Sequence, residues 1–309
     1  MRPAWTHCAL FSLCLLTLPS AHAQAEEEES ATLAADDDGM ELESVDVASG
    51  APQSSVGDWY GEAYPEVDRL LDTLTARTVR RGTFNPLIQH RTHEGALESP
   101  FSHFLGFDAG PLKVGLGVRY GLLDRWDVAV YRLNGALNAF NTYELDTRFQ
   151  LLAQRTDGLD LAGRVGVTWF QAPGTRSKLG GFAQVMVSRL LAERLFLNLG
   201  VLGHSRSTPQ FGDRKAVGDT AWSVAAQAGV EARLGESWAW DLEVTAAVAG
   251  WRDGVPIIST GPRYITSGHT FAVVLSNGQA SSADGIVTNS PRFRPREWLL
   301  GFNITREVS

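Results

Sequence analysis

The sequence predicts an all-β protein, an antiparallel up-and-down transmembrane β-barrel of about twelve strands. Between Leu112 and Val130, apolar side chains alternate with small or charged ones at the two-residue period of a β-strand. Tight turns alternate with long polar connections along the chain, a pattern typical of barrels in outer membranes. Most tryptophans lie near expected strand ends, where amphipathic rings are most stable at a membrane interface.

The composition is compatible with this fold. The chain has 309 residues, of which 44% are hydrophobic and 20% are charged. Lipid-facing apolar residues alternate with polar lumen residues in a membrane barrel, so a moderate average is expected. No apolar run long enough for a transmembrane helix follows the N-terminus. The formal net charge of -8 gives no basic surface for nucleic acid.

Residues 1–23 have the features of a cleaved export signal. Arg2 supplies the positive start, residues 9–18 the apolar core, and residues 21–23 the A-x-A cleavage motif. Cys8 and Cys14, the two cysteines of the chain, both lie in this segment. The mature protein is therefore expected to have no disulfide and no cysteine metal site.

Two segments separate the signal from the barrel. Residues 24–57 hold ten of the 35 acidic residues and no Lys or Arg, which predicts a disordered acidic leader. In residues 58–82, the apolar side chains follow helical spacing after Pro65 and suit a short amphipathic helix: Val67, Leu70, Leu71 and Leu74. Such a helix would cap the barrel, plug it or lead into it, and we favour a lead-in segment.

The barrel is expected over residues 83–309. Expected strands cover residues 83–92, 112–120, 126–131, 141–154, 159–170, 180–189, 195–204, 222–233, 240–248, a segment ending near 264, 269–277 and 296–308. Pro256 and Pro262 weaken the tenth of these. If both termini lie in the periplasm, the strand count is even. Twelve strands keep the short-long alternation of connections, and ten is the alternative.

The alternation also assigns residues to the two sides of the wall. Charged side chains on the inward face should form a lumen network in a narrow or closed interior: Arg119, Asp127, Glu144, Asp146, Arg148, Asp160, Arg164, Glu231, Arg233, Asp241 and Glu243. An aromatic girdle is expected from Trp126, Trp169, Trp222, Trp238, Trp240, Trp251 and Trp298. The alternative for these rings is the core of a two-sheet sandwich.

Four residues of metal-ligand type lie close in sequence: His90, His93, Glu94 and His103. His90 and His93 are three residues apart, so on a strand they would face opposite ways. A loop site built from the last three remains an alternative to ordinary surface or structural histidines. No metal or cofactor is predicted.

A second arrangement has the residue types of an outer-membrane lipid hydrolase: His269, Ser276 and Asn277. Seven residues of strand would separate the first two by about 23 Å. A nucleophile and its base need to lie within about 3 Å. The triad therefore fails unless His204 or another histidine replaces His269, and no catalytic residue is predicted.

Several short segments, taken in order, resemble one bacterial family: residues 88–91 (IQHR), 104–108 (FLGFD), 114–125, 151–154 (LLAQ), 267–271 (SGHTF), 276–277 and 300–304 (LGFNI). The chain is similar over residues 83–308 to the outer-membrane β-barrel family catalogued as domain of unknown function 5777. This resemblance implies the fold and an outer-membrane location in a Gram-negative bacterium. It implies no activity and no catalytic residues.

These observations favour an outer-membrane, porin-like barrel in contact with outer-membrane lipids. The expected role is a narrow channel, passage of a small-molecule solute, or a structural membrane component. An outer-membrane lipid hydrolase or deacylase is one alternative, and a soluble periplasmic ligand-binding barrel is another.

Overall fold

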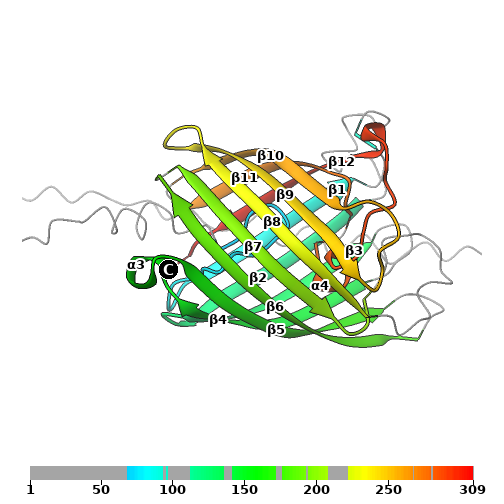
Figure 1. Cartoon of the computed structure of the whole chain (residues 1–309), viewed down its shortest axis with the longest axis horizontal. Coiled ribbons are helices and arrows are strands. Elements are labelled where there is room, and N and C mark those ends of the chain that lie inside the picture. Colours follow the sequence, from blue (N-terminus) through cyan, green and yellow to red (C-terminus); the bar gives the residue numbers. More distant parts are fainter. Residues whose placement is uncertain are drawn as a thin grey trace, which may run out of the picture. The chain divides into compact units, whose positions relative to one another are not determined.

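The fold is a single closed barrel of twelve antiparallel strands (Figure 1). It is seen in a computed structural model that describes residues 68–92, 95–96, 112–135, 141–171, 176–192, 194–207, 222–266, 268–279 and 281–308. The expected signal, the acidic leader and residues 58–67 lie outside these residues. Among the residues described, no helix is long and apolar enough to cross a membrane.

The strands follow one another around the barrel in chain order, and β12 pairs with β1 to close it. They are β1 (Phe84–Thr92), β2 (Leu112–Leu123), β3 (Trp126–Gly135), β4 (Asn141–Leu152), β5 (Asp160–Gln171), β6 (Lys178–Leu191), β7 (Leu195–His204), β8 (Ser223–Arg233), β9 (Trp238–Ala249), β10 (Ile257–Ile265), β11 (His269–Ser276) and β12 (Leu299–Arg306). The predicted count of twelve is confirmed.

The proline-interrupted tenth strand is present because its irregularity affects only one neighbour. Gly261 and Pro262 continue the register with β9, opposite Asp241 and Trp240. On the other side, the regular pairing with β11 stops at Thr260 and resumes at Arg263. Proline lacks a backbone N–H, so it is tolerated where one ladder is already broken.

All the short turns lie at one end of the barrel, and the longer connections lie at the other. The short-turn end also carries the one-turn helix α3 (Gln154–Asp157) and the chain's C-terminus (Figure 1). The long-loop end includes residues 277–298, which contain the one-turn helix α4 (Ala283–Ile286) and the 3-10 helix η2 (Pro295–Glu297).

The two faces of the wall differ as the alternation predicts. In β4, Leu145 and Leu151 point outward and are more than half exposed, whereas Asp146 and Arg148 point inward and are buried. The same pattern holds in β8 and β9. The described strands form one closed barrel, so the alternative of a two-sheet sandwich core for the tryptophans is wrong.

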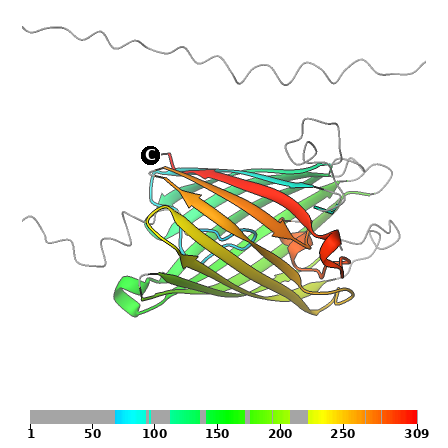
Figure 2. The ribbon, with the colours of Figure 1, turned by 90° about the horizontal axis from the view of Figure 1, so that it is seen from above.

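Residues 68–82 differ most from expectation. They form no helix, and residues 68–79 lie inside the barrel instead of leading into it (Figures 1 and 2). Residues 68–75 form a tight hairpin in which Thr75 N–H donates to the carbonyl of Asp68 and Leu70 N–H donates to that of Thr73. The apolar residues that suggested an amphipathic helix instead pack onto the inner wall, Leu70 against Phe196 and Leu74 against Met186.

Candidate functional site

The candidate site is the barrel lumen, where the structure gathers the charged residues assigned from the alternation. Ten of the eleven are buried on the inner wall, and Arg233 keeps only 6% of its side chain exposed. They come from β2, β3, β4 and β5 on one side and from β8 and β9 on the other. Ion pairs join nine of them in two networks, while Asp160 and Glu243 contact the segment inside the barrel.

The first network joins three arginines to three acids across β2 to β5. Arg119 lies 2.6 Å from Asp127 and 2.9 Å from Asp146. Arg164 lies 2.8 Å from Asp146 and also pairs with Glu144. Arg148 lies 2.6 Å from Asp127. Burying these charges is tolerable because each one has an oppositely charged partner.

The second network is centred on a residue of β10. Arg263 lies 2.6 Å from Asp241 and 3.3 Å from Glu231, and Arg233 lies 3.1 Å from Glu231. The Nη1 of Arg263 also donates to the carbonyl of Arg69, 3.0 Å away in the hairpin. This network therefore connects the wall to the segment inside it.

The tip of the hairpin is held by Glu243 of β9. The backbone N–H groups of Leu71, Asp72 and Thr73 all donate to its carboxyl group. The nitrogens of Asp72 and Thr73 each lie 3.1 Å from Oε2. Successive N–H groups that converge in this way form an anion-binding concavity. The Asp72 side chain continues outward to Arg91 at 2.7 Å and to the hydroxyl of Ser259.

The base of the hairpin is held mainly by Arg148. Its Nη1 donates to the carbonyl of Asp68 at 3.0 Å and to that of Thr75 at 2.9 Å, which clamps the two ends together. Farther along, Arg77 pairs with Asp160 at 2.9 Å. Burial lowers the pKa of Arg77 to about 10 against the opposing effect of Asp160, so Arg77 stays charged at neutral pH.

The long-loop end is closed by the connection between β11 and β12, which is one of the long connections expected from the sequence. Residues 282–290 are buried. Ile286 and Val287 pack with Phe182 and Leu202 on the inner wall. Ala283 N–H donates to Glu144 at 2.8 Å, so this loop contacts the first charge network directly.

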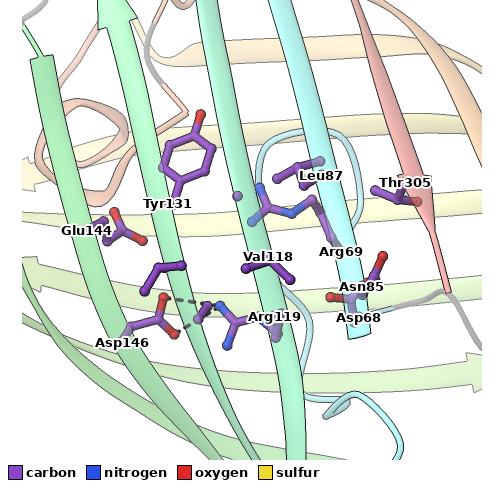
Figure 3. Close-up of a pocket in the computed structure, with 13 residues that line it drawn as sticks. Asp68, Arg69, Asn85, Leu87, Val118, Arg119, Tyr131, Glu144, Asp146 and Thr305 are labelled. Atoms are coloured by element: carbon purple, nitrogen blue, oxygen red, sulfur yellow. Dashed lines mark hydrogen bonds and ion pairs between the residues drawn. The ribbon is translucent and has the colours of Figure 1, made fainter. Parts of the chain in front are cut away.

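Little space remains between the hairpin and this loop. Two cavities of about 20 Å³ each are present, and both are lined by Arg69, Tyr131 and Glu144. Figure 3 shows Arg69 reaching from the hairpin toward the wall between Tyr131 and Arg119. A cavity of this size holds about one water molecule. Among the described residues, the hairpin and this loop fill the part of the lumen around these two cavities.

Two glycines make room for Tyr131 in the wall. A Cβ at Gly115 would lie 2.0 Å from the Tyr131 hydroxyl, and one at Gly117 would lie 2.8 Å from the ring. The hydroxyl bonds to Gln89 at 2.8 Å and to Ser281 at 2.6 Å. Tyr131 thus ties β3 to β1 and to the loop that closes the long-loop end.

The residues considered for metal binding or hydrolysis are not brought together. His93, Glu94 and His103 lie outside the described residues, and His90 stacks on Phe302. In the part of the chain that the structure describes, no three potential ligands cluster. His269 and Ser276 lie at opposite ends of β11, and the Ser276 hydroxyl contacts that of Ser259 at 2.7 Å.

The expected girdle is placed in two groups. Trp126, Trp238 and Trp240 lie on the outer face near the short-turn end, and Trp169 and Trp222 lie on it near the long-loop end. Trp298 directly precedes β12, and Trp251 lies in the β9–β10 connection. The indole nitrogen of Trp251 is buried, whereas an interfacial ring turns its polar end to water. The girdle role of Trp251 stays a prediction.

The sequence reasoning missed residues that complete the lumen: Asp68, Arg69, Asp72, Arg91, Tyr131 and Arg263. Arg263 lies at an inward position of β10, in step with the alternation of that strand. The alternation would have identified it if the prolines had not weakened the strand pattern. Asp68 and Asp72 stand between the apolar positions of the expected amphipathic helix, where a helix would place them on its polar face. No local signal shows that their segment lies inside the barrel.

Comparison with known proteins identifies the family. The model of a family described as a membrane-bound beta barrel domain, DUF5777, matches residues 66–307. The protein belongs to this family. Its match begins two residues before the hairpin, so the family model includes the lumen segment as well as the barrel. No curated protein matches the chain.

Several solved membrane barrels are similar in fold at low identity. The KdgM porin aligns with a TM-score of 0.47 and 7% identity, over 73% of this chain and 99% of its own. The NanC porin aligns with a TM-score of 0.45 and 10% identity, over 73% of this chain and 99% of its own. The COG4313 outer membrane channel from Pseudomonas putida F1 aligns with a TM-score of 0.45 and 12% identity, over 77% of this chain and 100% of its own.

Proposed function

We propose that the protein is a narrow outer-membrane channel for small solutes that its own residues 68–80 hold closed at rest. The observation that supports this most is the chemistry of the filled lumen. Buried acidic and basic side chains of the wall form hydrogen bonds with the backbone of this short segment. We include export by a cleaved signal over residues 1–23 in this proposal.

A permanently filled barrel has little need of such a wall. Replacing buried ion pairs with packed apolar residues is often neutral or stabilising, so a purely structural core would gain from an apolar interior. A charged wall is instead well suited to face water once the segment leaves. The bonds of Glu243 and Arg148 to backbone groups are ones that water can replace.

The geometry of the segment suits withdrawal through one mouth. Asp68 and Thr75 meet at the Arg148 clamp, and the tip at Leu71 to Thr73 lies deeper against Glu243. After the hairpin, the chain runs to Gly82 and Thr83, which bond to Gly121 beside the short turn of β2 and β3. The hairpin is thus attached at the short-turn end, and the β11–β12 loop closes the other end.

Planar-bilayer recording tests the proposal. The full chain should show rare or no conductance steps, and a deletion of residues 68–80 should show frequent ones. A second variant that also lacks residues 281–288 should conduct more, because it opens both ends. Deletion of residues 30–50, from the acidic segment that precedes the described residues, is the control and should behave like the full chain.

Folding of each variant is checked by heat-modifiable migration on gels. If both lumen deletions fold and neither conducts, the channel proposal is wrong and a structural role in the membrane takes its place. Frequent conductance by the full chain would also contradict it, because the segment would not close the barrel.

A further inference from the structure

The outer wall carries a feature that the channel proposal does not use. Outward positions on the described strands hold three arginines, Arg132, Arg189 and Arg306, and no acidic residue. Arg189 and Arg306 lie at the short-turn end. Arg132 is alone at the long-loop end, three residues before β3 ends.

The guanidinium of Arg132 is held in place by neutral neighbours. Its Nε and Nη2 donate to the Asn141 side-chain oxygen at 3.2 and 2.8 Å, and its Cζ lies 5.6 Å from the centre of the Tyr143 ring. Tyr143 in turn packs on Trp169, with ring centres 5.7 Å apart. Among the described residues, no ion pair joins Arg132 to a carboxylate.

An apolar hollow lies beside this arginine. It measures about 630 Å³ and is lined by Leu116, Val118, Val130, Leu145 and Val167 as well as by Tyr143 and Trp169. Val130 and Leu145 are paired across β3 and β4 in the row next to Arg132 and Tyr143. One fixed cation therefore adjoins a groove wide enough for acyl chains.

We propose that Arg132 and this groove bind a phosphorylated lipid of the leaflet at the long-loop end. The phosphate lies on the guanidinium, which keeps N–H donors beyond the two that Asn141 accepts. The acyl chains lie over Val130, Leu145 and Val167. An anionic headgroup is favoured because the site has a positive charge, and Glu144, the acidic residue among its described lining residues, turns its side chain inward to Arg164. This site depends on membrane insertion alone and is independent of whether the lumen conducts.

The test is native mass spectrometry of the detergent-purified full chain with a hexa-acylated lipid A that carries both phosphates, and with its fully dephosphorylated form. The wild type should bind the phosphorylated lipid at least fivefold more tightly. Arg132→Gln should lose this preference, and Arg132→Lys should keep part of it because a point charge remains. Arg189→Gln, which removes an outward arginine at the other end, is the matched control and should bind like the wild type.

Two further arms separate the lipid from simpler explanations. Inorganic phosphate at the same concentration should not compete, since it lacks the chains that occupy the groove. Val130→Trp, which fills the groove from a lipid-facing position, should weaken binding of both lipids while heat-modifiable migration shows a folded barrel. The proposal is overturned if Arg132→Gln and the wild type prefer the phosphorylated lipid equally, if the wild type shows no preference, or if inorganic phosphate displaces the lipid.

Discussion

Replacing Glu243 with alanine should release the hairpin tip from the wall. The change removes the acceptor for three backbone N–H groups, those of Leu71, Asp72 and Thr73, all in the buried lumen. Each buried donor left without a partner costs about 1–3 kcal/mol, and entering water offsets part of the sum. A net destabilisation of the seated hairpin by about 3 kcal/mol follows, equivalent to a shift of about 100-fold in its equilibrium with the withdrawn state.

Labelling of a single cysteine measures this shift. Thr73 is 2% exposed, and its hydroxyl has no hydrogen-bond partner among the residues that the structure describes, so Thr73→Cys should perturb the hairpin little. The two natural cysteines lie in the expected signal, so cleavage of that signal would leave a background without thiols. A water-soluble maleimide should label Cys at position 73 slowly in the wild-type background and about 100-fold faster with Glu243→Ala.

Two comparisons make the result interpretable. Glu243→Gln keeps one acceptor oxygen and should give an intermediate rate, while Glu236→Ala, in the exposed turn before β9, should change nothing. Equal labelling rates in Glu243→Ala and in the wild-type background, with both barrels folded, would refute the reasoning. Rapid labelling of the wild-type background would refute it as well, because the tip would then not be seated.

Three further substitutions test the rest of the structure. Arg148→Leu leaves Asp127 short of a buried partner and frees both ends of the hairpin, so it should cost about 3–5 kcal/mol, measured as a lower urea midpoint of barrel unfolding. The matched pair Arg148→Met with Asp127→Leu should cost less, and an equal or greater loss would contradict this. Val165→Arg places a charge on the lipid face, where Val165 is 52% exposed, and should weaken folding into vesicles by about 2–4 kcal/mol. Unchanged insertion would argue against lipid contact. Gly115→Val should displace Tyr131 and lower the unfolding midpoint, whereas the same change at Gly163, which faces open space, should not.

The wall could be predicted from the sequence because each of its side chains obeys a local rule. Asp146 and Arg148 lie on the opposite face of β4 from Leu145, and a strand places alternate residues on opposite faces. Because lipid surrounds the barrel, the apolar face of each strand must point outward and the polar face inward. Pro262 weakens the sequence pattern of the tenth strand, but the strand still forms because its pairing with β9 is continuous.

The filling of the lumen could not be predicted because it depends on contacts between distant parts of the chain. Leu71 and Glu243 are 172 residues apart, and Arg69 and Arg263 are 194 apart. Locally, Leu70, Leu71 and Leu74 fit a helical face equally well. The hairpin is favoured because Glu243 and Arg148 supply partners for its backbone groups, and these partners exist only after the barrel closes.

The central claim is that the segment after the leader occupies the lumen of a membrane-inserted barrel. A cysteine pair tests it most directly: Ala76 N–H donates to the Ser188 hydroxyl at 2.9 Å on the inner wall of β6. Oxidised membranes that contain the Ala76→Cys, Ser188→Cys variant should yield the internal disulfide almost completely, and the pair Ala76→Cys, Val187→Cys, whose second thiol points outward, should not. Failure of the first pair to crosslink in a folded barrel, or equal crosslinking of both pairs, would contradict the account.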